Sequence, residues 1–330
     1  MKRILVTGGA GYVGAHVCQK LADSGFVPIT YDNLSSGHRE AVQFGPLVFG
    51  DIRDTGKLVE TFLEFRPDAV MHFAARSEVG RSMTRPAETF SANLGGTASL
   101  LHACELSAVK HFVFSSTCAI FGEANGVALD ERAPQSPASI YGQSKRMVED
   151  MISASSEAMG LRFVSLRYFN AAGADPAARI GENHHPETHL IPLAIQAALD
   201  PLRKFKLHGT DYATPDGTAV RDYVHVLDLA DAHVKSLEYL RDGGGSTAFN
   251  LGSGRGYSVR EVIATVEMHT GRKLNLFEAA RRPGDPAHLL ANPAKAASIL
   301  GWQARLGLTD MVADATRWHQ ILAERKRDVA

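Results

Sequence analysis

Cysteine is scarce in this sequence, and neither sign of charge is in excess. The 330 residues include three cysteines, Cys18, Cys104 and Cys118. This odd number lacks the paired spacing of a zinc site or a disulfide framework, so we expect reduced thiols with no chemical role. Lys and Arg number 35 against 36 Asp and Glu, a formal net charge of -1. That balance argues against a nucleic acid or an anionic membrane as a partner.

Long hydrophobic runs are also missing. The apolar run that follows Met1-Lys2-Arg3 ends at Thr7, far short of the apolar region of a signal peptide. No window approaches the roughly 18–20 uninterrupted apolar residues that cross a bilayer. We therefore expect a cytoplasmic protein without a membrane partner. With 45% hydrophobic and 22% charged residues, the chain has the composition of a globular protein, and its length suggests roughly two domains.

The fourteen histidines include a group formed by His184, His185 and His189. Pro186 lies between them and breaks the helix that would place two of them on one face as metal ligands. We therefore interpret this stretch as a polar loop and predict no metal site.

Short β-branched runs alternate with longer amphipathic stretches in the first half of the chain. This alternation predicts parallel strands joined by crossover helices. The expected strands cover residues 3–7, 27–31, 47–50, 69–73, 111–115 and 162–167. One helix is expected directly after the first strand, and four more over residues 86–106, 141–159, 227–240 and 259–269. The helix over 86–106 is interrupted at Gly95-Gly96, and the helix over 141–159 is ended by Gly160.

The pattern predicts an α/β fold, a Rossmann-type doubly wound parallel sheet with a smaller C-terminal α/β lobe for substrate. We place an NAD-binding domain at residues 1–170, with later segments returning to it, and a substrate lobe at residues 171–330. Gly, Pro and Asp become frequent over residues 171–218, which suggests loops that cover the edge of the sheet. A ligand crevice is expected between the two parts.

A glycine motif marks the turn after the first strand. Gly9, Gly11 and Gly14 satisfy the pattern G-x-G-x-x-G at the point where a helix begins, so the backbone can approach a pyrophosphate at the positive end of that helix. Asp32 follows about 20 residues later, where its carboxylate can accept hydrogen bonds from a ribose. Because this carboxylate would repel a 2′-phosphate, we predict NAD rather than NADP as the cofactor.

A second motif supplies acid–base chemistry. Tyr141 and Lys145 are four residues apart, one turn along the same face of a predicted helix. A free tyrosine has a pKa near 10, so bringing it to about 7 takes roughly 4 kcal/mol, which nearby positive charge can supply. Thr117 follows the fifth strand, at the sheet edge where ligands bind, and could hydrogen-bond the same substrate hydroxyl.

Together these motifs resemble the extended short-chain dehydrogenase/reductases. Further segments are similar to the UDP-glucose 4-epimerases over nearly the whole chain. These segments are Tyr31-Asp32-Asn33-Leu34, Gly50-Asp51-Ile52-Arg53-Asp54, His72-Phe73-Ala74-Ala75, Phe114-Ser115-Ser116-Thr117, Leu166-Arg167-Tyr168-Phe169-Asn170, Asp216-Gly217-Thr218 and Arg221-Asp222-Tyr223-Val224-His225-Val226.

The resemblance implies an NAD-dependent interconversion of UDP-glucose and UDP-galactose. Tyr141 would take the proton from the sugar's 4-hydroxyl while hydride passes from C4 to tightly held NAD, and the resulting 4-keto sugar would rotate and be reduced on its other face. Lys145 would lower the pKa of the phenol and bind the nicotinamide ribose. A homodimer is the usual form of the family.

The resemblance also assigns the residues of the site. The catalytic residues are Thr117, Tyr141 and Lys145. The cofactor-binding residues are Gly8, Gly11, Tyr12, Val13, Gly14, Asp32, Asn33, Asp51, Ile52, Phe73, Ala74, Ala75, Ser77, Asn93, Lys145 and Phe169. The substrate-binding residues are Thr117, Tyr141, Asn170, His189, Leu190, Arg221, Tyr223, Val259, Arg282 and Asp285, with the two arginines on the diphosphate.

Three alternatives stay open or are disfavoured by particular residues. Related dehydratases carry an Asp-Glu pair after the active-site threonine, whereas Cys118-Ala119 follows Thr117 here. A 4-epimerase of a UDP-pentose, UDP-uronate or UDP-N-acetylhexosamine would use the same catalytic residues. Leu289 occupies a position where tyrosine crowds an N-acetyl group and a small residue admits it. An NAD-sensing protein without turnover is the third alternative.

Overall fold

A seven-stranded parallel sheet forms the centre of the computed structural model, which describes residues 2–122, 127–282 and 285–329. Its strand order is β10-β6-β5-β4-β1-β2-β3, and every neighbouring pair is parallel. The strands are β1 (Arg3–Thr7), β2 (Val27–Asp32), β3 (Leu47–Phe49), β4 (Ala69–His72), β5 (His111–Thr117), β6 (Arg162–Tyr168) and β10 (Thr247–Leu251). The predicted doubly wound α/β fold is thereby confirmed.

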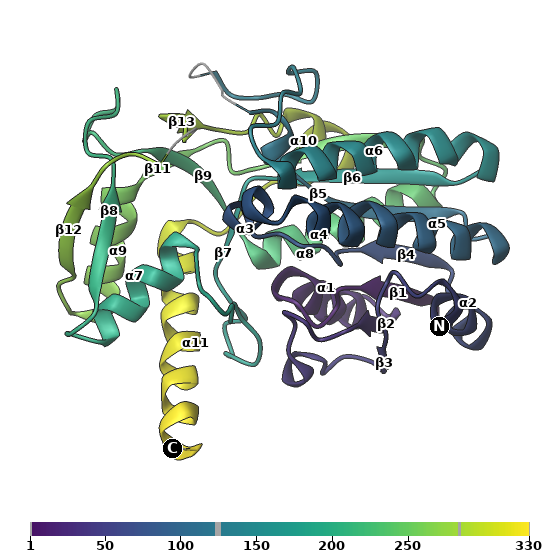
Figure 1. The fold of residues 1–330 in the computed structure, drawn as a ribbon, viewed down its shortest axis with the longest axis horizontal. Helices are drawn as coiled ribbons and strands as arrows, with labels where there is room; N and C mark the ends of the chain where they lie inside the picture. Colours follow the sequence, from purple (N-terminus) through teal and green to yellow (C-terminus); the bar gives the residue numbers. More distant parts are fainter. Residues whose placement is uncertain (1, 123–126, 283–284, 330) are drawn as a thin grey trace.

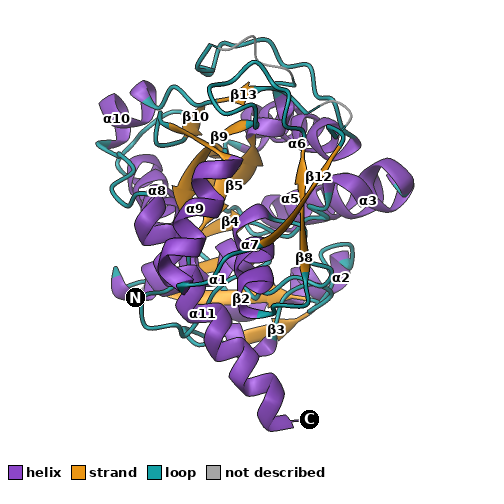
Figure 2. Cartoon of the chain, turned by 90° about the vertical axis from the view of Figure 1, so that its left-hand side faces the viewer, coloured by secondary structure: helices purple, strands orange, loops and turns teal. Residues whose placement is uncertain are grey.

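Helices cover both faces of this sheet, as Figures 1 and 2 show. One face packs against α1 (Tyr12–Asp23) and α8 (Val226–Arg241), and the other against α2 (Thr55–Phe65), α5 (Gly96–Leu106) and α6 (Ile140–Met159). The strands inside the sheet are buried on both faces, which explains their continuous apolar runs, whereas the edge strand β3 is partly exposed. The strand order reverses between β1 and β4, so the doubly wound fold leaves a crevice at the carboxyl ends of these strands.

The helix predicted over residues 86–106 changes its hydrogen bonding at Ser91–Gly95, while Gly95 and Gly96, where an interruption was expected, keep helical backbone angles. It consists of α4 (Pro86–Phe90), a π-helical turn η2 (Ser91–Gly95) and α5, preceded by the short α3 (Val79–Thr84). A Cβ atom on Gly96 would lie 2.3 Å from Ile52 Cδ1, whereas one on Gly95 would meet nothing within 4 Å. Close packing therefore requires glycine at only one of the two positions.

The second part of the molecule is built around β9 (Val220–His225). This strand pairs with β7 (Asn170–Ala172), β11 (Gly256–Ser258) and β13 (His288–Leu289), and a separate parallel pair joins β8 (Lys204–His208) to β12 (Asn275–Ala279). Three helices, α7 (Leu190–Leu199), α9 (Val259–Thr270) and α11 (Leu308–Val329), pack together beside these strands (Figure 1). The remaining elements are α10 (Ala294–Leu300) and the 3-10 turns η1 (Arg39–Ala41) and η3 (Cys118–Ile120).

The stretch at residues 171–218 contains more regular structure than the sequence predicts, because α7 and β8 lie within it. The chain then returns to the central sheet through α8 and β10. The division at residue 170 stays a prediction. Among the described residues, no helix combines the length and the apolar character needed to cross a membrane. The three cysteines are free and buried.

Candidate functional site

A cavity of about 460 Å³ lies at the carboxyl ends of the central strands and extends to β7, β9 and α7. Most residues expected to bind cofactor or substrate line it. These are Gly8, Gly11, Tyr12, Val13, Gly14, Asp32, Asn33, Asp51, Ile52, Phe73, Ala74, Ala75, Ser77, Thr117, Tyr141, Phe169, Asn170, His189, Leu190, Arg221 and Tyr223. Asn93, Lys145, Val259, Arg282 and Asp285 are outside this lining.

The turn after β1 is built for close backbone contact. Gly8 has φ +75°, and a Cβ atom there would lie 2.5 Å from the amide nitrogen of Ala74. A Cβ atom on Gly14 would lie 2.2 Å from the carbonyl oxygen of Gly8. Helix α1 begins after Gly11 with no side-chain cap, so its first N–H groups face the cavity without a side chain over them. This arrangement suits a pyrophosphate.

Asp32 ends β2 and anchors the next turn. The amide N–H groups of Ala10 and Leu34 donate to its carboxylate at 3.0 and 2.8 Å. Burial raises the pKa of Asp32, and these two donors act in the opposite direction. Each of its oxygens thus accepts one backbone bond and keeps a second lone pair for a ribose hydroxyl.

The hydrogen-bond acceptor sites of the Asp51 carboxylate are filled by other groups of the protein. Arg53 donates three hydrogen bonds to its carboxylate and Asn33 Nδ2 donates a fourth at 2.9 Å. The hydrogen bonds from Arg53 lower the pKa of Asp51 despite its partial burial. Because four lone-pair sites are filled, an adenine contact through this carboxylate would require Arg53 to move, and the contact stays a prediction.

Asn93 ties elements together beside the cavity. Its amide oxygen accepts from the backbone N–H of Arg76 at 2.7 Å, and its amide nitrogen donates to the Arg76 carbonyl and to Ser144 Oγ at 3.2 and 2.8 Å. The amide therefore holds the segment after β4 against α6. In this arrangement Asn93 positions the segment after β4, and its contact with a cofactor stays a prediction.

The residues predicted to carry out acid–base chemistry, Thr117, Tyr141 and Lys145, lie where β5 ends and α6 begins. Lys145 Nζ donates to the Ser115 carbonyl at 2.8 Å and lies 4.7 Å from the centre of the Phe114 ring. Burial lowers the pKa of Lys145 to about 7, and Glu149 acts in the opposite direction. Burial raises the pKa of Tyr141, with hydrogen bonding from Thr117 opposing it. The phenol thus sits beside Thr117, while the ammonium group is held by the backbone of β5.

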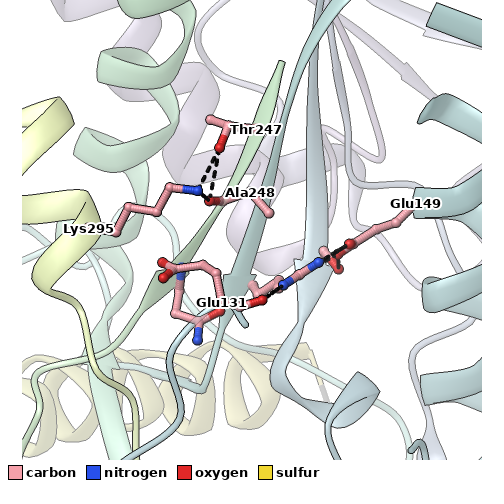
Figure 3. A network of polar contacts seen from close by, with 8 residues as sticks. Glu131, Glu149, Thr247, Ala248 and Lys295 are labelled. Atoms are coloured by element: carbon pink, nitrogen blue, oxygen red, sulfur yellow. Dashed lines mark hydrogen bonds and ion pairs between the residues drawn. The ribbon is translucent and has the colours of Figure 1, made fainter. Parts of the chain in front are cut away.

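A buried ion pair fixes this corner of the sheet. Arg167 Nε donates to Glu149 Oε1 at 3.0 Å, and Ser116 Oγ donates to the same carboxylate. Arg167 also donates to the Glu131 carbonyl at 3.2 Å, and Glu131 Oε1 accepts from the N–H of Asn250 at 2.7 Å. Figure 3 shows Glu149 and Glu131 at the two ends of this chain of contacts. Strands β5, β6 and β10 are thereby joined to α6, one turn after Lys145.

Figure 3 also shows Lys295 reaching β10 from α10. Its Nζ donates to Thr247 Oγ1 at 2.7 Å and to the Ala248 carbonyl at 2.8 Å. This contact ties the helix after β13 to the edge strand of the central sheet. The C-terminal chain is thus anchored to the central sheet.

Strand β9 gathers the residues expected to bind substrate. Tyr223 pairs with Asn170 of β7, and Arg221 pairs with Leu289 of β13. Arg221 and Tyr223 are two residues apart, so their side chains share one face of the strand. The Arg221 guanidinium donates to Asp285 and to the carbonyls of Val220 and Pro286. These contacts hold the guanidinium at the cavity wall. Asp285 pairs with Arg221 and does not itself line the cavity.

A cluster of two glutamates and two histidines, Glu182, His184, Glu187 and His189, lies before the start of α7 and was not predicted from the sequence. Burial alone would lower the pKa of His189, but the carboxylates of Glu182 and Glu187 raise it to about 10. Conversely, burial would raise the pKa of Glu182, while His189 and His184 lower it to about 2. Sequence spacing suggested a helical histidine pair broken by Pro186, whereas the structure assembles the group from an extended loop.

Comparison with known proteins places the chain among its relatives. The model of the NAD dependent epimerase/dehydratase family matches residues 4–252, and the chain belongs to that family. It is 50% identical over 316 residues to a UDP-glucose 4-epimerase of Rhizobium meliloti, covering 96% of each chain. This match confirms the resemblance inferred from the motifs.

The fold of the chain is also similar to solved structures of UDP-glucose 4-epimerases. A UDP-glucose 4-epimerase from Brucella ovis in complex with NAD is 46% identical with a TM-score of 0.94, covering 96% of this chain and 98% of the other. One from Bifidobacterium longum in complex with NAD+ and UDP is 34% identical with a TM-score of 0.92, covering 97% and 98%. These two proteins therefore share the fold over nearly the whole length of this chain.

Proposed function

We propose that the protein is an isomerase that interconverts UDP-glucose and UDP-galactose with a tightly bound NAD. The observation that carries this proposal is the meeting of Thr117 and Tyr141 with the glycine turn in one cavity, which is lined on its far side by Arg221. An oxidation site and a diphosphate site are thus within reach of one nucleotide sugar.

The chain's own residues fit NAD at the proposed positions. Gly8, Gly11 and Gly14 bring the backbone and the start of α1 to the pyrophosphate, and Asp32 accepts from the adenosine ribose. NAD, when bound, accepts hydride from the sugar and returns it to the same carbon.

Proton transfer belongs to Tyr141. Its phenolate oxygen takes the proton of the 4-hydroxyl, which Thr117 Oγ1 holds by a hydrogen bond. After the 4-keto sugar has rotated, the phenol returns the proton to the oxygen at C4. Because burial raises the pKa of Tyr141, the phenolate needs positive charge close by, and the Lys145 ammonium group, one helical turn along α6, can supply it. We propose that Lys145 acts through this field and through the ribose of the nicotinamide.

The substrate is held by groups that converge on β9. Arg221 stabilises the diphosphate by charge-assisted hydrogen bonds, with Arg282 expected to assist. Asn170, Leu190, Tyr223 and Val259 complete the uridine side. Leu289 pairs with Arg221 in the sheet and lines the cavity, so its side chain is placed to influence which sugar substituents fit. We also propose that the protein is a homodimer in the cytoplasm. Light scattering on the purified protein measures the molar mass and so tests the dimer.

The direct test uses protein purified without added cofactor. UDP-galactose is supplied, and UDP-glucose is separated by chromatography and quantified. Conversion without added NAD supports both the reaction and a retained cofactor. A parallel series with UDP-pentoses, UDP-uronates and UDP-N-acetylhexosamines gives the relative kcat/KM. Absence of conversion with every sugar, even after NAD is supplied, would contradict the proposal and favour a binding protein.

A further inference from the structure

Four side chains with metal-binding atoms converge in the segment between β7 and α7. Glu182, His184, Glu187 and His189 each offer one ligand atom, and all four atoms lie within 4.8 Å of one another. The loop reaches this arrangement without a helix. Neither the proposed hydride step nor the proposed proton transfer uses these side chains.

The distances match a tetrahedral metal site. Glu182 Oε1 lies 3.1 Å from His184 Nδ1 and 2.6 Å from His189 Nδ1, and Glu187 Oε1 lies 3.3 Å from His189 Nδ1 and 4.0 Å from His184 Nδ1. With metal–ligand bonds of about 2.0–2.2 Å, neighbouring ligand atoms in a tetrahedron are about 3.3–3.6 Å apart. Each of these four pairs therefore needs to adjust by no more than about 1 Å.

One carboxylate oxygen in the cluster is buried and has no partner. Glu187 Oε1 accepts from the N–H groups of Thr188 and His189 at 2.7 and 2.9 Å, whereas Glu187 Oε2 makes no hydrogen bond. The side chain is only 4% exposed. His184 Nδ1 is likewise buried and faces Glu182 Oε1 at 3.1 Å without hydrogen-bond geometry. An unpaired buried acceptor is costly, and a cation bound here would satisfy it.

The backbone of the loop is already held in place. The carbonyl of Glu182 accepts from Trp318 Nε1 at 2.8 Å, and the carbonyl of Asn183 accepts from His38 Nε2 at 2.7 Å. The side chain of Glu182 is 5% exposed. Two buried carboxylates carry two negative charges, which a divalent cation with two neutral imidazoles balances.

We propose that Glu182, His184, Glu187 and His189 bind a zinc ion. Two imidazole nitrogens and two carboxylate oxygens suit zinc and similar transition metals, while magnesium and calcium prefer all-oxygen shells. Four protein ligands close the coordination shell, so the ion is structural and fixes the segment that leads into α7. Binding of the ion does not depend on the proposed reaction.

The test measures zinc on the full-length protein after its affinity tag has been removed. Chelator-treated protein is titrated with zinc chloride by calorimetry, and metal content is measured by mass spectrometry after desalting. Wild type is expected to retain one zinc per chain and to unfold at a higher temperature when zinc is present. His184→Ala and Glu187→Gln are expected to bind zinc at least about tenfold more weakly.

The exposed neighbour His185 supplies the matched control. His185→Ala is expected to bind zinc as wild type does. Equal zinc affinity in wild type, His184→Ala and Glu187→Gln would overturn the proposal, as would magnesium or calcium binding as tightly as zinc. Cobalt-loaded wild type provides a measurement without any variant. An intense visible spectrum indicates tetrahedral coordination, and a weak octahedral spectrum would contradict the site.

Discussion

Single residues of the site were predictable where the chemistry is local in sequence. The glycine turn, Asp32, and the pair Tyr141 and Lys145 each sit within one strand–turn–helix segment, so their spacing alone predicts their proximity. Glu182 was not predictable because its partners meet through a loop whose path is set by Trp318, far along the chain. The short-range pattern around Pro186 pointed away from the group that the tertiary structure forms.

Tyr141→Phe tests the proton-transfer group. Loss of the phenolic oxygen is expected to lower kcat by about 10²–10⁴-fold, because the 4-hydroxyl then has no base. NAD content should be unchanged, since the ring still fills its place. Activity is followed by chromatography of UDP-sugars. Tyr239→Phe, which alters a tyrosine packed on Phe249, serves as the control, and a Tyr141→Phe enzyme with most of its activity would remove this residue from the mechanism.

Arg221→Ala tests the diphosphate contact. The substitution removes a cation and leaves Asp285 unpaired, so UDP binding is expected to weaken by about 2–5 kcal/mol. Calorimetry with UDP measures the effect directly. Arg272→Ala removes an exposed arginine that follows the C-terminal cap of α9 and should leave UDP affinity unchanged. If Arg221→Ala binds UDP as wild type does, the diphosphate lies elsewhere.

At the scale of elements, periodicity located the six predicted strands and the helices around them. Helix α6 begins within one residue of the expected start, and Gly160 caps it with φ 57°. The seven strands from β7 to β13 were not expected, because they are at most six residues long and gain their stability from partners distant in sequence. Local propensity carries little information about such pairings.

Gly142→Ala tests how closely α6 approaches the end of β5. A Cβ atom on Gly142 would lie 2.3 Å from the carbonyl oxygen of Ala119, so the helix must shift and carry Tyr141 away from Thr117. We expect a loss of about 1–3 kcal/mol in unfolding free energy and a lower kcat.

Gly95→Ala is the matched control. Its backbone is helical and a Cβ atom there meets nothing within 4 Å, so it should gain about 0.4–1 kcal/mol. Urea unfolding and the epimerisation assay measure both variants. A fully active and stable Gly142→Ala protein would contradict this packing.

At the scale of the whole molecule, sequence patterning predicts a sheet and a second lobe but not how they interlock. The return of residues 247–251 to the central sheet and the pairing of Leu289 with Arg221 join segments separated by tens of residues. These contacts follow from packing the complete chain. They bring both halves of the proposed site to one cavity, which no local pattern contains.

Buried histidines make the stability of the fold depend on pH. Burial lowers the pKa of His72 to about 3 and those of His16 and His233 to about 4. Their pKa values when unfolded lie near 6.5, so below that pH the unfolded chain binds protons that the folded chain does not. The free energy of unfolding must therefore fall as pH falls from 6.5 towards 4, by up to about 1.4 kcal/mol per pH unit for each histidine.

Urea unfolding between pH 6.5 and 5 measures this slope. His72 is hydrogen-bonded to Thr7 and Thr97 through its two ring nitrogens, and His72→Gln should reduce the slope by the share of one histidine. His102→Gln, at an exposed position on α5, provides the control. A free energy of unfolding that stays constant over this range would show that the buried rings accept protons in the folded state.

The central claim is that the site oxidises C4 of a UDP-sugar and reduces the same carbon. UDP-galactose carrying deuterium at C4 tests it most directly, with the protein as purified and the product examined by mass spectrometry and NMR. We predict UDP-glucose that retains deuterium at C4, because a hydride that passes from carbon to a retained cofactor and back does not exchange with water. Product that has exchanged C4 hydrogen with solvent, or no product, would contradict the account.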